Sequence, residues 1–245
     1  MKNLTNLNHY IAFAELFRYP GENCKEIAIA CQKIIDEQYP EISSELKLFT
    51  DHLINNSVYD CQSLYTKTFD VQPMCYLDLG YVIFGEDYKR GAFLLHMKDE
   101  QRKAGIDCGS ELPDNISNVL ILMAHHGPNT FIRELVAKIV APGVDKMIDE
   151  FAKARIDLKI KVLRKLHKTV IDENLNHGNL YLHAFVSLKL LLEQDFGKEI
   201  NEHKLTIQKD QENNQPFFKK RNATSHEPIL DPVEEMNLIT NHKLD

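Results

Sequence analysis

The stretch LNHYIAFAELFRYPG, residues 7–21, decides the fold class because it shows both a helical repeat and the way that repeat ends. Its apolar residues recur every three or four positions from Leu7 to Phe17, which places them on one face of a helix. Pro20 and Gly21 follow directly, and this pair cannot continue a helix. The stretch therefore predicts an amphipathic helix followed by a sharp break.

The same combination of helical period and breaker recurs over the chain before residue 198. Further breakers stand at Pro40, Pro73, Gly85, Pro113, Pro128, Pro142-Gly143 and Gly178. No Asn-Gly or Asp-Gly turn separates alternating apolar runs, so no sheet is indicated. The sequence predicts an all-α, single-domain helical bundle over residues 1–197.

Two helices are predicted at the end of this domain. The first, the longest predicted, runs from Gly143 to about Asn174, and the second runs from Leu180 to about Phe196. The first helix is rich in lysine and arginine between residues 153 and 168. Its broad apolar stripe and the acidic charge of the whole chain favour a solvated basic face over a nucleic-acid surface.

The composition changes after Gly197. Residues 198–245 are polar and have little periodicity, so we expect a mostly disordered tail that cannot bury enough apolar area to fold. Its apolar anchors gather between Ile229 and Ile239, where a short helix could dock on the chain's own body or on a partner. An inert tail is the alternative.

Composition and charge narrow the functional classes. The chain has 245 residues, 43% of them apolar, and a formal net charge of -7, which disfavours a nucleic-acid binder or an anionic-membrane binder and favours a cationic partner. The five cysteines form no Cys-x-x-Cys pair, and their odd number points to a reducing compartment. Neither a basic leader nor a membrane-length apolar stretch is visible, so we expect a soluble cytoplasmic protein without membrane insertion.

No catalytic or metal-binding motif is visible. The chain contains 11 histidines, but neither Glu-x-x-His nor His-Glu-x-x-His occurs. A nucleophile elbow, a Walker loop and a dinucleotide-binding glycine motif are also missing. His125 and His126 are interpreted as the polar end of a helix before Gly127. We therefore predict a protein that is not an enzyme and needs no metal or cofactor.

The stretch FGEDYKRGAFL, Phe84 to Leu94, combines a helix start with an unusual glycine. Glu86 and Asp87 suit the first turn of a helix, and Arg90 is spaced to pair with Glu86. Gly91 in mid-helix costs about 0.8 to 1.0 kcal/mol relative to alanine. Something is expected to pass close to Gly91, either a neighbouring helix, which we favour, or the backbone of a ligand.

The stretch GSELPDN, Gly109 to Asn115, is a second acidic loop. Pro113 and Asp114 are typical of a helix start, whereas Glu111 is not needed for one. If the two loops lie together, Glu111 adds to the charges of Glu86 and Asp87 and forms a patch that can receive arginine. Two unrelated helix caps are the alternative.

Four motifs in this order and spacing resemble the NarJ family of nitrate reductase molybdenum cofactor assembly chaperones, a branch of the TorD-like redox enzyme maturation proteins. They are LFRYP (Leu16–Pro20), LYTKTFD (Leu64–Asp70), FGEDYKRGAFL (Phe84–Leu94) and ELPDNISNVLILMA (Glu111–Ala124). The resemblance covers about residues 7 to 197. The tail lies outside it.

The resemblance implies a cytoplasmic, all-helical private chaperone without enzymatic activity. Such a protein binds the N-terminal region of a molybdoenzyme catalytic subunit and keeps it competent for cofactor insertion and complex assembly. Respiratory nitrate reductase is the client expected first, and molybdenum cofactor biosynthesis proteins are further potential partners. The alternatives are a client of the dimethyl sulfoxide, trimethylamine N-oxide or selenate reductase type, and a helical nucleotide or metal binder that uses Glu86, Asp87 and Asp114.

The resemblance also implies a peptide groove with an apolar floor and an acidic rim. Tyr65, Phe69 and Leu112 would form the floor, Glu86, Asp87, Glu111 and Asp114 the rim, while Arg90 would hold Glu86. The complete predicted site comprises Tyr65, Phe69, Asp70, Glu86, Asp87, Arg90, Gly91, Glu111, Leu112, Pro113, Asp114 and Asn115. Val82, Phe84 and Asn115 stand where family members commonly have histidine, so no pH-dependent release is carried over.

Overall fold

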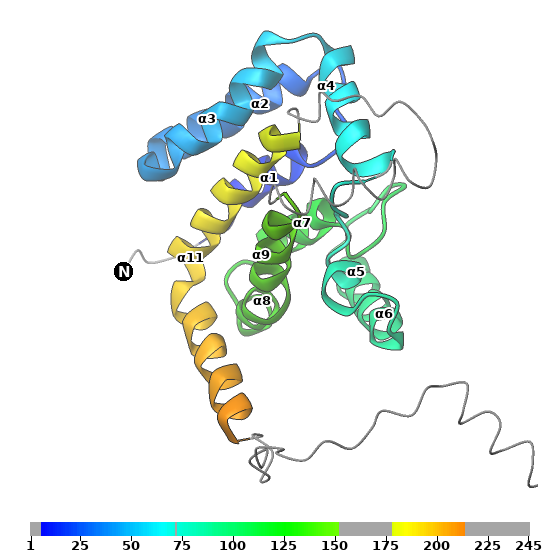
Figure 1. The fold of residues 1–245 in the computed structure, drawn as a ribbon, viewed down its shortest axis with the longest axis vertical. Helices are drawn as coiled ribbons and strands as arrows, with labels where there is room; N and C mark the ends of the chain where they lie inside the picture. Colours follow the sequence, from blue (N-terminus) through cyan, green and yellow to red (C-terminus); the bar gives the residue numbers. More distant parts are fainter. Residues whose placement is uncertain (1–5, 72, 152–177, 214–245) are drawn as a thin grey trace, which may run out of the picture. The chain divides into compact units, whose positions relative to one another are not determined.

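A computed structural model describes residues 6–71, 73–151 and 178–213, and it confirms the all-α fold class (Figure 1). In chain order the elements are α1 (His9–Leu16), α2 (Cys24–Gln38), α3 (Pro40–Asn55), α4 (Val58–Tyr65), η1 (Thr66–Asp70), α5 (Leu79–Phe84), α6 (Tyr88–Lys103), α7 (Ile116–His126), α8 (Thr130–Leu135), η2 (Val136–Val140), α9 (Ala141–Glu150) and α11 (Gly178–Asn213). Within the described residues, extended backbone pairs only at one isolated bridge, between Asp78 and Asn115.

Several helices begin where short polar side chains cap them. Ser57 and Asp60 form a reciprocal capping box at α4. Asp87, Asn115 and Asn129 each accept a hydrogen bond from a backbone N–H in the first turn of α6, α7 and α8. These caps fix the helix starts.

The core is built around α1, which packs against α2 and α7. Tyr10 and Phe13 of α1 and Phe17, which directly follows it, are fully buried. The Phe17 ring lies 4.8 Å from the ring of Phe185 in α11. The apolar face read from residues 7–21 therefore becomes the centre of the molecule, as its helical period predicts.

A buried polar contact joins three distant parts of the chain. The Asp195 carboxylate of α11 lies 2.8 Å from His9 Nε2 of α1 and accepts a hydrogen bond of 2.9 Å from the Tyr39 hydroxyl at the α2–α3 junction. The His9 and Asp195 side chains are only 3% and 2% exposed. Because buried polar groups must be paired, this contact specifies how α11 meets α1.

The predicted break at Pro142-Gly143 is wrong. Helical turns continue from Thr130 to Glu150 through the π-turn η2, in which the Ala141 N–H donates to the carbonyl of Val136. A proline in an α-helix lacks the donor and collides with the carbonyl four residues earlier, and a wider turn just before it relieves this collision. Gly143 is buried inside α9, where an added Cβ would lie 2.5 Å from Leu79 Cδ2 of α5. Its small size lets α5 approach α9.

Two predicted helix boundaries also change. The helix expected from Gly143 to Asn174 begins at Ala141 and is followed as α9 to Glu150, and residues 152–177 lie outside the described part. The last helix was expected to end at about Phe196, and the backbone does leave the helical conformation there, with φ of -128°, but a further helical stretch continues beyond this kink, so α11 reaches Asn213. Ile200 beyond the kink is 3% exposed, so packing extends past the predicted boundary at residue 197.

The chain as far as Thr206 forms one compact unit, and residues 207–245 are assigned to a second. Of the predicted tail, residues 214–245, including the short helix expected near 229–239, lie outside the described residues. All five cysteines carry free thiols. In the described ranges, no helix combines the length and apolar character needed to cross a bilayer.

Candidate functional site

The Asp114 carboxylate lies at the centre of a charged cluster made by Asp78, Gly80, Arg90 and Asp114, in which Asp114 is buried and Asp78 and Arg90 are half-buried. Asp114 Oδ2 accepts a hydrogen bond of 3.1 Å from the Gly80 N–H and lies 3.9 Å from Arg90 Nε. Arg90 Nη2 lies 3.5 Å from Asp78 Oδ2. We call this group the Asp114 cluster. It joins α5, α6 and the loop before α7.

Backbone contacts strengthen the same junction. The Leu79 N–H donates to the Asp114 carbonyl at 2.9 Å, and the Ile116 N–H donates to the Leu77 carbonyl at 2.8 Å. The Arg90 guanidinium also lies over the Tyr81 ring, 5.1 Å from its centroid. The Asp114 cluster is therefore held by backbone pairing, charge and an aromatic face together.

Asp114 was expected on an open acidic rim, and this expectation is wrong because the residue is fully buried. Burial, followed by the negative charge of Asp78, raises the pKa of Asp114 from its ordinary 3.8 to about 6, although Arg90 acts in the opposite direction. Burial also raises the pKa of Asp78 against the lowering effect of Arg90 and Asn115. One arginine thus compensates two carboxylates incompletely.

The expected pairing of Arg90 with Glu86 is also wrong, since Arg90 faces Asp78 and Asp114 instead. Glu86 and Asp87 are exposed, and Asp87 caps α6 by accepting from the Lys89 N–H at 2.8 Å, which confirms the predicted helix start. A Cβ added at Gly91 would meet nothing within 4 Å in the described residues. The neighbouring helix that we favoured beside Gly91 is therefore not found, and the approach of a ligand backbone remains a prediction.

The predicted helix start at Pro113 and Asp114 lies two residues too early. The helix α7 begins at Ile116, and Asn115 is its cap, accepting from the Ser117 N–H at 3.0 Å. The Pro113 carbonyl instead accepts a hydrogen bond of 2.7 Å from the Gln101 side chain. Pro113 and Asn115 therefore shape the loop that faces α6.

Tyr65 and Phe69 form part of a buried aromatic cluster and are 6% and 8% exposed. Their rings lie 5.0 Å apart, and the Phe69 ring lies 4.6 Å from that of Tyr181 in α11. Since so little of either ring is accessible, they are not the open floor of a groove. They belong to the buried core instead, where they pack against each other and against Tyr181.

The carboxylates near Tyr65 show which of the acidic segments lie close together. After burial, the carboxylates of Glu111, Asp70 and Asp78 raise the pKa of Tyr65, so these three groups lie near one phenol. The exposed Tyr19 of the LFRYP motif also stacks edge-on against Tyr65, with centroids 5.4 Å apart. Residues from all four sequence motifs thus gather in one region, through Tyr19, Tyr65, Glu111 and the Asp114 cluster.

An apolar hollow of about 720 Å³ adjoins this region, between α6 and the loop before α7. We call it the α6 hollow. Leu95 and Leu112, which are 68% and 44% exposed, lie in its lining. The full lining comprises Leu94, Leu95, Lys98, Gln101, Arg102, Gly105, Ile106, Asp107, Cys108, Gly109, Glu111, Leu112 and Pro113.

Side-chain amides fix the loop wall of the α6 hollow. Gln101 donates to the Pro113 carbonyl and accepts from the Cys108 thiol at 3.0 Å. Asn118 of α7 donates to the Leu112 carbonyl at 3.0 Å. These hydrogen bonds fix the position of the loop relative to α6 and α7, and Leu112 on the loop stays exposed.

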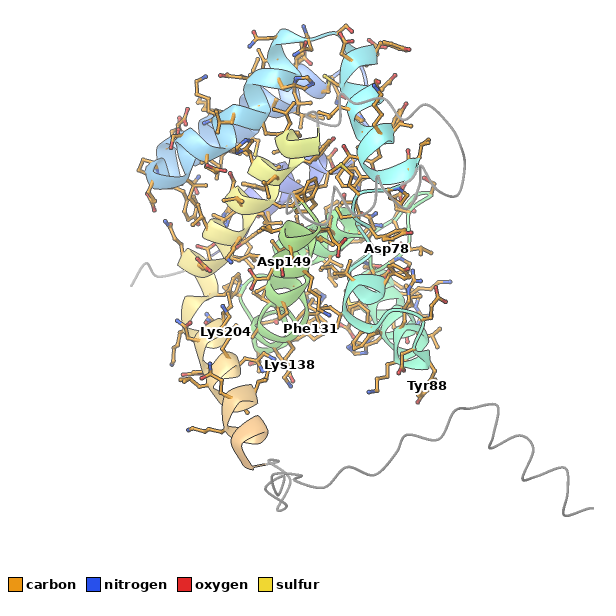
Figure 2. The ribbon with its side chains drawn as sticks, in the orientation of Figure 1. Asp78, Tyr88, Phe131, Lys138, Asp149 and Lys204 are labelled. Carbon is orange, nitrogen blue, oxygen red and sulfur yellow. The ribbon has the colours of Figure 1, made fainter. Side chains whose placement is uncertain are left out.

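Glu86 lies away from the α6 hollow. It influences the pKa of Tyr76, which lines a different hollow of about 540 Å³ between α5 and α9. In Figure 2 the labelled Asp149, also in that lining, marks α9, which contacts α5. Glu86 lines neither hollow, and Glu111 lines only the α6 hollow. The predicted rim that joins Glu86 to Glu111 is therefore not formed by these hollows.

Sequence reasoning missed Asp78, Gly80, Leu95 and Lys98. Asp78 directly precedes α5, so in the sequence it resembles an ordinary helix cap, although it makes no cap hydrogen bond. A Cβ on Gly80 would lie 2.5 Å from Asp114 Oδ2, which explains a glycine that marks no turn. In the described residues no group of three or more His, Cys, Asp or Glu side chains could hold a metal ion.

Comparisons with known proteins leave the family open. No family model matches the chain, and no curated protein matches it either.

Replacing Arg90 by Gln should destabilise the protein, because it leaves the buried Asp114 carboxylate and the half-buried Asp78 carboxylate without their cation. Removing one partner of a buried pair costs about 3 to 5 kcal/mol. Since 24% of the Arg90 side chain is exposed, we expect a loss near the lower end of that range. Urea unfolding measures the loss. Arg102→Gln is the matched control, because Arg102 is 78% exposed and, among the described residues, forms its ion pair with Asp99 of its own helix.

The stability of the protein should fall as pH rises through the titration of Asp114. An acid with a raised pKa contributes stability that is complete below its ordinary pKa, here 3.8, and that is lost as pH rises through about 6. The loss is on the order of 2 to 3 kcal/mol. Asp114→Asn removes this contribution, so the free energy of unfolding of wild type minus that of the variant should decrease between pH 4.5 and 7.5. Asp99→Asn, which changes an exposed carboxylate on α6, is measured alongside as the control, and a constant difference for Asp114→Asn would refute the burial argument.

Gly80→Ala and Gly91→Ala should change stability in opposite directions. The new methyl at position 80 would collide with Asp114 Oδ2 and would lie 3.0 Å from Phe93 Cδ1, so we expect a loss of about 1 to 3 kcal/mol. The methyl at position 91 meets none of the described residues within 4 Å and should stabilise α6 by about 0.8 to 1.0 kcal/mol. Thermal unfolding of both variants compares them, and an equal shift for both would contradict the packing described.

Proposed function

We propose that this protein is a chaperone that binds the amino-terminal segment of a molybdoenzyme catalytic subunit, with respiratory nitrate reductase as the first candidate. The observation that carries the proposal is the exposed apolar hollow beside the region where residues of the four motifs meet. Leu95 and Leu112 both line it and remain 68% and 44% exposed. Exposed apolar surface that lines a hollow is typical of a surface that another molecule covers.

The dimensions and shape of the α6 hollow support a peptide as its occupant. One wall is the helix α6 and the other is the loop before α7, so the α6 hollow is open along a helix. Amphipathic segments bind to such surfaces by placing their apolar face against the groove. Glu111 at the edge of the loop wall is exposed and can select the register of a bound segment.

The Asp114 cluster has a supporting role in this proposal. It joins α5 and α6 to the loop that contains Leu112, so it sets the separation of the two walls of the α6 hollow. Of the predicted peptide-site residues, Leu112 and Glu111 are accessible in the α6 hollow, whereas Asp114, Tyr65 and Phe69 act from beneath. Arg90 positions both walls through the Asp114 cluster.

Leu95→Gln should weaken client binding about tenfold or more without unfolding the protein. Burying one leucine stabilises a complex by about 1.5 to 3 kcal/mol, and 1.4 kcal/mol is tenfold in the dissociation constant. Isothermal titration calorimetry with a synthetic peptide of the amino-terminal segment of a nitrate reductase catalytic subunit measures the change. Leu48→Gln on α3 is the matched control, since Leu48 is 51% exposed and does not line the α6 hollow.

Parallel titrations separate the remaining alternatives. Leader peptides of dimethyl sulfoxide, trimethylamine N-oxide and selenate reductases test a different client. Saturable heat with magnesium, manganese or GTP and none with any leader peptide would replace the chaperone by a nucleotide or metal binder. Equal affinity of wild type and Leu95→Gln for the peptide would remove the α6 hollow from the mechanism.

A further inference from the structure

The charges that line the α6 hollow differ in whether they already have partners. Arg102 pairs with Asp99 at 3.1 Å, Asp107 accepts from the Gly109 N–H at 2.9 Å, and Glu111 accepts from the Asn115 side chain at 3.4 Å. Lys98 makes neither a hydrogen bond nor an ion pair with the described residues. Lys98 is therefore the cation of this lining that has no hydrogen-bond or ion-pair partner in the described residues, although the chain as a whole is acidic.

Lys98 is also placed where an occupant of the hollow would meet it. It follows Leu94 and Leu95 at four and three residues, so these side chains share one face of α6. All three lie in the lining of the α6 hollow. A segment that covers the two leucines must therefore pass within one helical turn of the Lys98 ammonium group.

We infer that the segment bound in the α6 hollow contributes a carboxylate to Lys98, about one helical turn from the apolar residue that covers Leu95. This inference rests on the proposed function and specifies the chemistry of the client. The partner is an apolar segment with an aspartate or glutamate on the flank of its apolar face. The negative net charge of the chain predicts a cationic partner, but Lys98 selects an anionic side chain at this position.

The orientation of the bound segment follows from the opposite wall. Glu111 is exposed on the loop wall, across the hollow from α6, and favours a basic or amide side chain. A segment whose acidic flank faces Lys98 and whose other flank faces Glu111 can bind in one orientation only. The charges therefore act mainly on specificity, while the leucines supply the affinity.

A charge-reversal experiment tests the pairing with the full chain. Lys98→Glu should weaken binding of the client peptide about five- to tenfold, because an attraction becomes a repulsion. A peptide in which the pairing acid is replaced by lysine should bind wild type more weakly and should recover affinity for Lys98→Glu. Single replacement of each acidic peptide residue by its amide identifies the pairing acid, and calorimetry measures each dissociation constant.

Lys89→Glu is the matched control, because Lys89 is an exposed lysine on the same helix that does not line the α6 hollow. It makes the same change in net charge and should alter the affinity of all peptides by less than about twofold. A second readout is salt dependence, which should be weaker for Lys98→Met than for wild type, since screening acts on the lost ion pair.

The outcomes distinguish this inference from the proposed function. If Leu95→Gln weakens binding but Lys98→Glu binds every peptide as wild type does, the inference is overturned and the chaperone function stands. Equal weakening for acidic and amide peptides by Lys98→Glu also overturns it. If wild type binds none of the leader peptides, the proposed function fails first.

Discussion

The buried carboxylate of Asp114 is the constraint on which the arrangement of α5, α6 and the loop before α7 depends. A charge removed from water is tolerated only when donors and an opposite charge replace its hydration. The Gly80 N–H and Arg90 fill this role from two different elements. The bulk of Asp114 in turn requires glycine at position 80, so electrostatics and packing select the same geometry.

The pairing of Asp114 with Gly80 and Arg90 also fixes the shape of the α6 hollow, which we propose as the client site. Its walls are α6 and the loop that ends at Asp114, and neither wall could shift without separating Asp114 from Arg90 or Pro113 from Gln101. Exposed leucines on a surface held in this way keep their positions when no partner is bound. A surface that is organised in advance lowers the ordering cost of binding, which is an advantage for a protein that must hold a flexible segment.

The sequence predicted the fold class and the start of α6 because these depend on neighbours within a few residues. The apolar period of α1 and the capping of α6 by Asp87 are local in this sense. The same reasoning failed at Pro142, where a π-turn accommodates the proline, and at Gly91, where none of the described residues approaches an added Cβ within 4 Å. In both cases the prediction used only the free-energy cost of proline or glycine within a helix. The structure around the residue decided whether the helix broke and whether a neighbour came close.

The sequence by itself determined that this chain folds into helices, that α6 begins after Asp87, and that its acidic and apolar residues are arranged in ordered motifs. Only the tertiary structure decided which of those residues are buried supports and which are accessible. Arg90 could reach either Glu86 or a carboxylate from another element, and spacing along a helix cannot distinguish the two. Arg90 pairs with Asp78 and Asp114 because a cation stabilises a carboxylate that is removed from water more than it stabilises a solvated one. Whether a carboxylate is removed from water is a property of the folded chain as a whole.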